Sequence, residues 1–361
     1  MRVSHVIAPG PMAGAENVVL QGCAALLAKG HELALLVMVD RRCPEHGERF
    51  VDAAHRKGIP TSTIPVRGRL DPRAISSLRT LLKSNDTEVV HVHGYKALIY
   101  ALLARSRGSG LVVTHHGDTG HDSLARFYER LARFAYRLVD LVFSVSRATT
   151  EALADAGVPR SKLRTVPNPV SLPAPDATAA RGASEGALLF VGRLSEEKGL
   201  DVLLRAMASP EIPEDLMLEV AGDGPSAKAW KALASSLGLD ERVRWLGVRR
   251  DVPALLAGAR ALVLPSLREG LPLVVLEAAS CEVPVVASRV GGVPETVWEG
   301  ETAILVEPGD VAAWTSALQI LLSRAEHLRE GAQRRGAEVR ARHAPERWAE
   351  LTSECYREAA K

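Results

Sequence analysis

Residues 265–278 read Pro-Ser-Leu-Arg-Glu-Gly-Leu-Pro-Leu-Val-Val-Leu-Glu-Ala and follow the apolar run Ala-Leu-Val-Leu at 261–264. The apolar run is typical of a buried parallel strand, and Pro272 suits the first turn of a helix, where an N–H would have no partner within the helix. The segment therefore predicts a strand, a turn that contains Glu269 and a helix that contains Glu277. Strands that alternate with helices in this way build α/β folds with parallel sheets.

The two glutamates of this segment are eight positions apart in the sequence. At 1.5 Å per helical residue, the path from Pro272 to Glu277 covers about 7.5 Å, so we expect the carboxylates about one sugar ring apart. A helix N-terminus lies between them, and its free N–H groups and positive dipole end favour a phosphate. The spacing alone favours the ordinary interpretation, in which Glu269 is a turn residue and Glu277 an exposed helix carboxylate.

The composition predicts two ordinary domains without a strong overall charge. The 361 residues are 47% hydrophobic, and 45 Lys and Arg residues nearly balance 43 Asp and Glu residues, which gives no global sign of nucleic-acid binding. The four cysteines form no Cys-x-x-Cys pair, so neither a zinc site nor a disulfide framework is indicated and a cytoplasmic location is expected. The apolar run at 3–8 is too short for a signal peptide, and no segment reaches the roughly 20 apolar residues that span a bilayer.

Short apolar runs alternate with helical patterns through the first half of the chain. A helix is expected over 15–29, and strands are expected over 3–8, 32–39, 61–65, 88–92, 111–114, 141–144 and 163–166. This alternation is typical of a doubly wound parallel sheet. It predicts an N-terminal Rossmann-like domain over 1–170.

A second series of strands follows the breaker-rich stretch 171–186, which is interpreted as a linker. Strands are expected over 188–191, 216–221, 243–246, 261–264 and 283–287, and they define a second Rossmann-like domain over 187–340. The last segment, 341–361, has apolar residues at helical spacing after Pro345 and predicts an amphipathic helix. Two such domains side by side would leave a cleft at the carboxyl ends of their strands, where these folds bind ligands.

The sequence contains three motifs: Glu269-Gly270-Leu271-Pro272 with Glu277, Gly192-Arg193-Leu194-Ser195-x-x-Lys198-Gly199, and Gly291-Gly292-Val293-Pro294-Glu295. In order and spacing they resemble those of the retaining glycosyltransferases of family 4, which have the two-domain GT-B fold. The resemblance covers nearly the whole chain. The resemblance implies transfer of a sugar from a nucleoside diphosphate sugar to an acceptor hydroxyl with retention of the α configuration. It also implies that the closing helix crosses back onto the first domain.

The resemblance places the donor phosphates at Arg193 and Lys198, which would stabilise the nucleoside diphosphate as it leaves. Two cations at a helix start suit a diphosphate, although a lone Arg/Lys pair is more often a pair of surface charges. Glu277 would accept hydrogen bonds from the ribose hydroxyls, a role that suits a group without donors.

The same resemblance has Glu269 position the donor sugar together with the backbone of Gly270 and Leu271. The loops at 222–225 and 247–249 resemble the nucleotide-side loops of the family, which adds Gly222 and Arg249 as candidate ligands. Turn chemistry alone would also explain the glycine, aspartate and proline residues of these loops.

In the first domain, Gly14 follows the first strand and would let the backbone approach a ligand. The family usually has Gly-Gly-Ala-Glu here, and Ala13 replaces the first glycine in this chain. His116 matches the cleft histidine of the family, which contacts the transferred sugar. His91 and His93 share one face of a strand, as zinc ligands would, but no third or fourth ligand is evident, and strand packing is the more ordinary role for His91 and His115.

No Asp-x-Asp sequence occurs in the chain, so we expect no metal and no other cofactor, with Arg193 and Lys198 neutralising the diphosphate instead. A UDP-sugar is the expected donor by family frequency alone. The acceptor could be a lipid-linked glycan, a small metabolite or an aglycone, which leaves glycan, glycolipid and glycosylated-metabolite biosynthesis open. A nucleotide-sugar epimerase of GT-B fold and a catalytically decayed nucleotide-sugar-binding protein remain alternatives.

The segment 124–139 predicts a helix with arginines on one stripe and apolar side chains on another. A basic amphipathic helix can lie on an anionic membrane surface. It can equally be a solvated face over a core, so peripheral membrane contact stays an open alternative. The sequence carries no information on the oligomeric state.

Overall fold

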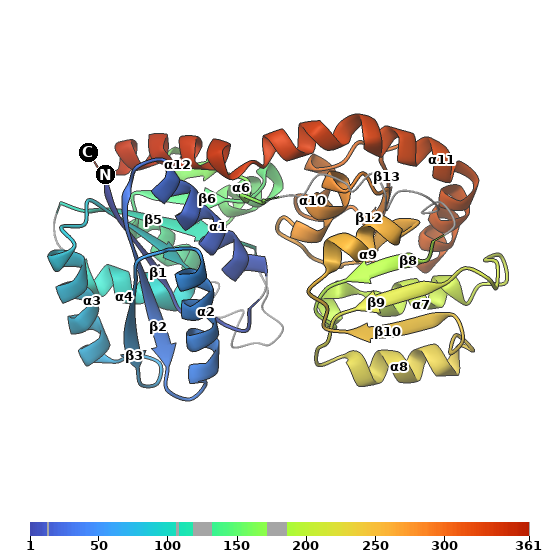
Figure 1. The fold of residues 1–361 in the computed structure, drawn as a ribbon, viewed down its shortest axis with the longest axis horizontal. Coiled ribbons are helices and arrows are strands. Elements are labelled where there is room, and N and C mark those ends of the chain that lie inside the picture. The colour runs from blue at the N-terminus through green and yellow to red at the C-terminus, as the bar shows by residue number, and fades with distance from the viewer. Residues whose placement is uncertain (13, 106–107, 118–131, 172–185, 361) are drawn as a thin grey trace. The chain divides into compact units, whose positions relative to one another are not determined.

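The structure is a computed structural model that describes residues 1–12, 14–105, 108–117, 132–171 and 186–360. The chain divides into two compact units: the first comprises Met1–Ser171 and His343–Lys361, and the second comprises Leu172–Arg342. Each unit is built on one parallel sheet covered by helices (Figure 1). The predicted linker, apart from its two end residues, lies outside the described residues.

The sheet of the first unit has seven strands in the order β3-β2-β1-β4-β5-β6-β7, all parallel. Its strands are β1 (Arg2–Ile7), β2 (Glu32–Asp40), β3 (Thr61–Val66), β4 (Val89–His93), β5 (Gly110–His115), β6 (Leu141–Ser144) and β7 (Leu163–Thr165). The helices are α1 (Gly14–Ala28), α2 (Pro44–Arg56), α3 (Pro72–Ser84), α4 (Tyr95–Ala104), α6 (Arg147–Asp155) and α12 (Pro345–Ala359).

Alternating side chains of these strands fill two separate cores. In β2, Leu36 and Met38 face the core under α3 and α4, whereas Leu35 and Val37 face the core under α1, α2 and α12. Successive side chains of a strand point to opposite faces, so a strand buried on both faces is apolar throughout. This explains why the strands of this unit appear in the sequence as continuous apolar runs.

The last helix of the chain, α12, belongs to the first unit. A Cβ atom at Gly22 of α1 would lie 2.7 Å from the Trp348 ring, and one at Gly110 would lie 2.4 Å from the Ala359 carbonyl oxygen. These glycines let α12 approach α1 and the start of β5 closely. The side chain of Tyr356 is consequently fully buried.

The sheet of the second unit has six parallel strands in the order β10-β9-β8-β11-β12-β13. They are β8 (Leu188–Val191), β9 (Leu218–Ala221), β10 (Val243–Gly247), β11 (Ala261–Leu264), β12 (Val285–Ser288) and β13 (Ala303–Val306). The helices are α7 (Leu200–Met207), α8 (Ala227–Ser236), α9 (Val252–Gly258), α10 (Leu273–Ser280) and α11 (Val311–Arg342), which is kinked at Arg324. The strand β13 is not predicted from the sequence, although its four-residue apolar run is like that of β11, which is predicted.

In both sheets the strand order reverses beside the first strand of the unit. The reversal falls between β1 and β4 in the first sheet and between β8 and β11 in the second. Open α/β sheets bind ligands outside the carboxyl ends of the strands at this switch point. The loops that follow β1, β4, β8 and β11 are therefore the first places to look for a site.

Every helix in the described part of the chain is too short or too polar to cross a bilayer. Of the predicted helix at 124–139, residues 124–131 lie outside the described residues. In the remainder, Phe134 and Leu138 are 61% and 55% exposed, and the Arg137 guanidinium carbon lies 5.9 Å from the centroid of the Phe134 ring. The prediction of a membrane-facing helix stays a prediction.

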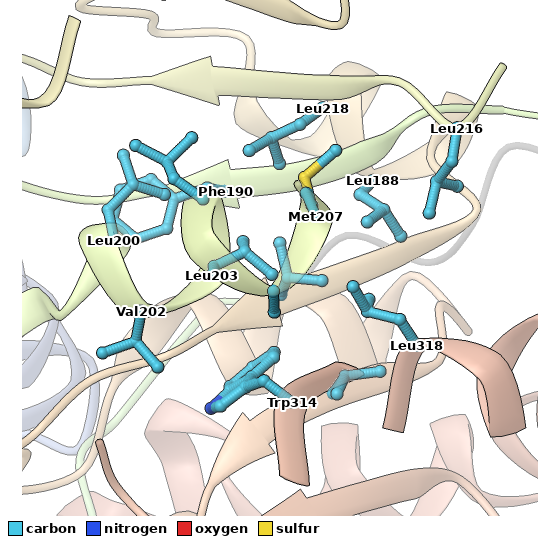
Figure 2. Close-up of a cluster of buried hydrophobic side chains, with 14 of the residues drawn as sticks. Leu188, Phe190, Leu200, Val202, Leu203, Met207, Leu216, Leu218, Trp314 and Leu318 are labelled. Carbon is cyan, nitrogen blue, oxygen red and sulfur yellow. The ribbon is translucent and has the colours of Figure 1, made fainter. Parts of the chain in front are cut away.

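The larger core of the second unit includes Trp314 of α11, and Val202, Leu203 and Leu318 are the labelled side chains nearest to it (Figure 2). Trp314 is fully buried, and its indole N–H has no hydrogen-bond partner among the described residues. Its contribution to stability is therefore apolar packing, reduced by the desolvation of one unpaired donor.

We expect Trp314→Ala to lower the free energy of unfolding of the second unit by about 3–5 kcal/mol, because it leaves a large cavity. Trp314→Phe should cost much less, since it removes the unpaired N–H together with part of the ring. Urea denaturation followed by circular dichroism measures both, with Ile320→Ala on the exposed side of the same helix as control. Equal losses for the Ala and Phe variants would contradict this interpretation.

Candidate active site

The loops after β8 and β11 bring two of the predicted donor residues into contact. Lys198 Nζ lies 2.6 Å from Glu269 Oε1, and the Ser266 hydroxyl donates to the same oxygen at 2.7 Å. The two charged side chains are 20% and 8% exposed. An ammonium group has three donors, so Lys198 keeps two N–H groups for phosphate oxygens while it holds Glu269.

The contact depends on glycine at the end of the first loop. Gly199 has φ +59°, and a Cβ atom there would lie 2.3 Å from the Pro265 carbonyl oxygen. The Leu267 N–H donates to the Glu197 carbonyl at 2.7 Å, which joins the two loops by backbone as well. Only glycine fits this position, because both the left-handed conformation and the missing side chain are needed.

The third sequence motif holds the turn that contains Glu269. Gly291 has φ +52°, and a Cβ atom on it would lie 2.1 Å from the Glu269 carbonyl oxygen. The Gly292 N–H donates to the Gly270 carbonyl at 2.6 Å. The three motifs, which are far apart in the sequence, thus form one packed group of loops at the switch point of the second sheet.

Glu277 lies on α10 and is half-buried, and its carboxylate forms no hydrogen bond or ion pair with any described residue. Burial raises the pKa of its carboxyl above the ordinary value. The helix begins one residue later than expected, since Pro272 is its N-cap and Leu273 its first residue. An unpaired, partly desolvated carboxylate gains most from a ligand that donates hydrogen bonds, such as a pair of ribose hydroxyls.

Arg193 is exposed, and it too has no ion-pair partner among the described residues. Arg249 is exposed and pairs with Asp251 at 2.5 Å, which gives this side chain a local partner. Gly222 follows β9, where a Cβ atom would lie 1.8 Å from the Gly192 carbonyl oxygen. Backbone packing against the loop after β8 is therefore a sufficient reason for that glycine, and its contact with a nucleotide stays a prediction.

Of the first-unit candidates, Gly14 is the exposed first residue of α1, and Ala13 lies outside the described residues. His116 follows β5 and is partly exposed, and its Nε2 lies 3.4 Å from Nδ1 of His93. Burial, helped by nearby His115, lowers the pKa of His116 to about 4. The ring is consequently neutral near pH 7 and can offer one donor and one acceptor.

The interpretation of His91 as a satisfied, strand-packed residue is confirmed. Its Nε2 lies 2.7 Å from the Thr114 hydroxyl, and its Nδ1 lies 2.6 Å from the Tyr356 hydroxyl. His115, half-buried, has its Nδ1 3.1 Å from the hydroxyl of Tyr136.

The structure adds a third histidine that sequence reasoning missed. One ring nitrogen each of His5, His91 and His93 lies within 4.8 Å of the others, a spacing that could hold a metal ion. However, both nitrogens of all three rings already have hydrogen-bond partners, which are one another, His116, Thr114 and Tyr356. The register of β1 against β4 pairs His5 with His91, and no spacing in the sequence indicates that pairing.

A cavity of about 200 Å³ opens beside the carboxyl ends of β2, β3 and β4. Arg42, Arg69 and Lys96 line it together with Tyr95. Asp40 pairs with Arg42 at 2.7 Å and Lys96 at 3.2 Å, and the hydrogen bonds from Arg42 hold the pKa of the Asp40 carboxyl well below its usual range. Three cations against one carboxylate make this cavity suitable for an anionic group.

Two family models match the chain, one described as Glycosyltransferase Family 4 at residues 12–172 and one described as Glycosyl transferases group 1 at residues 185–324. Over 341 residues the chain is 31% identical to a GDP-mannose-dependent alpha-(1-6)-phosphatidylinositol monomannoside mannosyltransferase of Mycolicibacterium smegmatis, and the match covers 87% of each protein. The chain belongs to glycosyltransferase family 4. This family 4 enzyme is a hexosyltransferase with a nucleotide-sugar donor and a separate acceptor substrate, as the motifs indicate.

Other similarities of this glycosyltransferase agree with the assignment. It is 40% identical over 142 residues to a D-inositol 3-phosphate glycosyltransferase of Corynebacterium efficiens, a match that covers 37% of this chain and 34% of that one. The solved structure of Anabaena HepE in complex with UDP-glucose superimposes with a TM-score of 0.83 at 21% identity and 98% coverage of both chains. This likeness confirms the GT-B fold predicted from the sequence.

We expect Gly291→Ala to weaken nucleotide binding by about tenfold to hundredfold, because the new methyl group displaces the turn that carries Glu269. Gly300→Ala is the matched control: it has a similar positive φ of +79° but nothing within 4 Å of an added Cβ. Both variants should lose about 1–2 kcal/mol of stability from the left-handed backbone. Isothermal titration calorimetry measures the nucleotide affinities of the two variants. Equal affinities would contradict the proposed role of Gly291.

Proposed function

We propose that the chain is a retaining hexosyltransferase that moves a hexosyl group from a GDP-hexose to a hydroxyl of a phosphorylated polyol acceptor. The observation that carries the proposal is the Lys198–Glu269–Ser266 contact at the switch point of the second sheet, with Arg193 and Glu277 unpaired nearby in sequence. Lys198 and Arg193 supply the charge that a departing diphosphate needs. Glu277 supplies the acceptor for ribose hydroxyls.

Retention is proposed from the resemblance to family 4, and the state of Glu269 bears on the route by which it occurs. Retention through a covalent intermediate needs a free carboxylate nucleophile, whereas Glu269 Oε1 is held by both Lys198 and Ser266. We therefore infer attack on the same face of the sugar: the bond from the anomeric carbon to the phosphate oxygen breaks as the acceptor oxygen bonds to that carbon. The acceptor proton passes to the leaving phosphate, whose charge Arg193 and Lys198 stabilise.

The choice of GDP follows the relative matched over 87% of its length, whose name specifies GDP-mannose. The sequence analysis instead expects UDP, by family frequency alone. The acceptor class follows the cationic cavity beside β2, β3 and β4. It also follows the names of the two curated relatives, one of which contains phosphatidylinositol monomannoside and the other D-inositol 3-phosphate. Under this proposal His116 contacts the transferred sugar, and Gly14 lies by the same ligand.

Calorimetric titration of GDP, UDP and ADP into the metal-free protein tests the donor assignment. GDP should bind most tightly, and Glu277→Ala should weaken binding by about tenfold to hundredfold, since hydrogen bonds to a charged group are worth about 1.5–3 kcal/mol. Glu326→Ala, an exposed glutamate on α11, is the control. Selective UDP binding would replace the donor in the proposal, and no binding of any nucleotide would favour a decayed site.

Lys198→Ala should lower kcat by at least about a hundredfold, because it removes charge stabilisation of the leaving diphosphate. The melting temperature should fall as well, because Glu269 loses its charged partner in a largely buried position, so kcat is compared on protein shown to be folded. Lys228→Ala, an exposed lysine on α8, should leave both quantities unchanged. Nucleotide release from the GDP-hexose is measured with and without an inositol phosphate acceptor. Release that needs no acceptor would favour the epimerase alternative, and full turnover by Lys198→Ala would remove the proposed role of this residue.

A further inference from the structure

Six residues of the first unit form one continuous series of hydrogen bonds, here named the histidine–tyrosine chain. The successive contacts are Thr114 Oγ1 to His91 Nε2 (2.7 Å), His91 Nδ1 to Tyr356 Oη (2.6 Å), Tyr356 Oη to His5 Nε2 (3.1 Å), His5 Nδ1 to His93 Nε2 (3.0 Å) and His93 Nδ1 to His116 Nε2 (3.4 Å). The residues come from β1, β4, the end of β5, the loop after it and α12. The series therefore joins the last helix of the chain to a candidate sugar-contacting histidine.

The interior members of the histidine–tyrosine chain are shielded from solvent. His5, His91 and Tyr356 are fully buried, and His93 is 6% exposed. The cavity beside them, which Thr114 and His116 also line, measures about 10 Å³, which leaves room for one water molecule at most. These groups consequently have to satisfy one another.

Burial also keeps every member of the chain uncharged near pH 7. It lowers the pKa of His5 to about 3 and the pKa values of His91 and His93 well below the ordinary value, and it raises the pKa of Tyr356 well above 10. A neutral imidazole carries one N–H and one lone pair, and a phenol carries one O–H. Each interior member can therefore donate only once, either toward Thr114 or toward His116.

Each contact needs one proton, and a Tyr356 oxygen that accepted from both His91 and His5 would leave its own buried proton unpaired. With that arrangement disfavoured, all five hydrogen bonds point the same way. If they point toward His116, the Thr114 hydroxyl starts the series as a donor. If they point toward Thr114, its hydroxyl accepts from His91, and its own proton then has no acceptor among the described residues. An unpaired buried donor is costly, so the first direction is favoured.

We propose that the histidine–tyrosine chain fixes the tautomer of His116. With the donors pointing toward it, His116 accepts at Nε2 and carries its proton on Nδ1, so it presents an N–H donor to a sugar oxygen. The other five members, Thr114, His91, Tyr356, His5 and His93, are then positioning residues that act through His116. The catalytic consequence rests on the proposed function, in which His116 contacts the transferred sugar, whereas the tautomer itself does not.

Nitrogen-15 NMR of histidine-labelled, ligand-free full-length protein tests the tautomer directly, with His116→Gln used to assign the signals. The wild type should show a single Nδ1–H tautomer at His116. Tyr356→Phe removes one hydroxyl from the middle of the chain and should produce a mixture of tautomers. Tyr100→Phe is the matched control, because it removes another buried hydroxyl of this unit, one that accepts from the Asp71 N–H outside the chain.

A second pair of variants, Thr114→Val and Thr114→Ser, tests the same series of hydrogen bonds at its other end. Their result does not depend on whether Tyr356→Phe folds. The valine variant removes the first donor and should give mixed tautomers, whereas the serine variant should restore a single one. In turnover assays kcat should fall by about twofold to tenfold in the valine variant with the donor KM unchanged, because only part of the molecules hold the productive tautomer. The serine variant should restore kcat.

A mixture of tautomers in the wild type, or an unchanged His116 signal in both Tyr356→Phe and Thr114→Val, would overturn the proposal even if nucleotide binding behaves as expected. Stoichiometric metal in the purified protein, bound through His5, His91 and His93, would overturn it as well. A single tautomer that both variants disrupt would support it even if no nucleotide binds. The failure of this inference and the failure of the proposed function are thus separate results.

Discussion

The close approach of the loops after β8 and β11 is the constraint on which the second unit depends. The approach is possible because Gly199 and Gly291 have no side chains, and it brings the Lys198 ammonium against the Glu269 carboxylate in a largely buried position. Two charges taken out of water cost several kcal/mol each, and their attraction offsets this cost only when further hydrogen bonds satisfy them. The Ser266 hydroxyl supplies one such bond, and the remaining donors of Lys198 are available to a phosphate. A site of this kind gains stability when the ligand brings the missing partners.

In the first unit the main constraint is the burial of polar rings in the core. His5, His91 and Tyr356 lie deep between the sheet and α12, where each unmade hydrogen bond would cost about 1–3 kcal/mol. They form hydrogen bonds with one another, so a substitution at one position changes which hydrogen bonds the other residues can donate or accept. Such networks specify one arrangement of protons as well as one arrangement of atoms. The same packing ties the C-terminal helix to the strands that carry the candidate histidines.

Both units place their polar groups at the point where the strand order reverses. In the second sheet this point carries Lys198 and Glu269, and in the first it carries His93 and the loop before α1. Parallel strands with crossover helices present all their carboxyl ends at one edge, so loops that are distant in the sequence become neighbours there. The same sheet topology therefore positions charged loops in the second unit and neutral histidines in the first.

The sequence by itself determined most of the strand order, the two-unit organisation and the family, because apolar runs, breaker residues and the three motifs are local patterns. It made Arg193, Lys198, Glu269 and Glu277 candidates, because the motifs that resemble family 4 contain them. Only the tertiary structure decided that Lys198 contacts Glu269, that Gly291 packs under the Glu269 turn, and that His5 and Tyr356 join His91. These contacts depend on strand register and on segments about 20 to 350 residues apart meeting in space, and local periodicity carries no information about either. The strand β13, a four-residue apolar run, was also decided only by its pairing with β12.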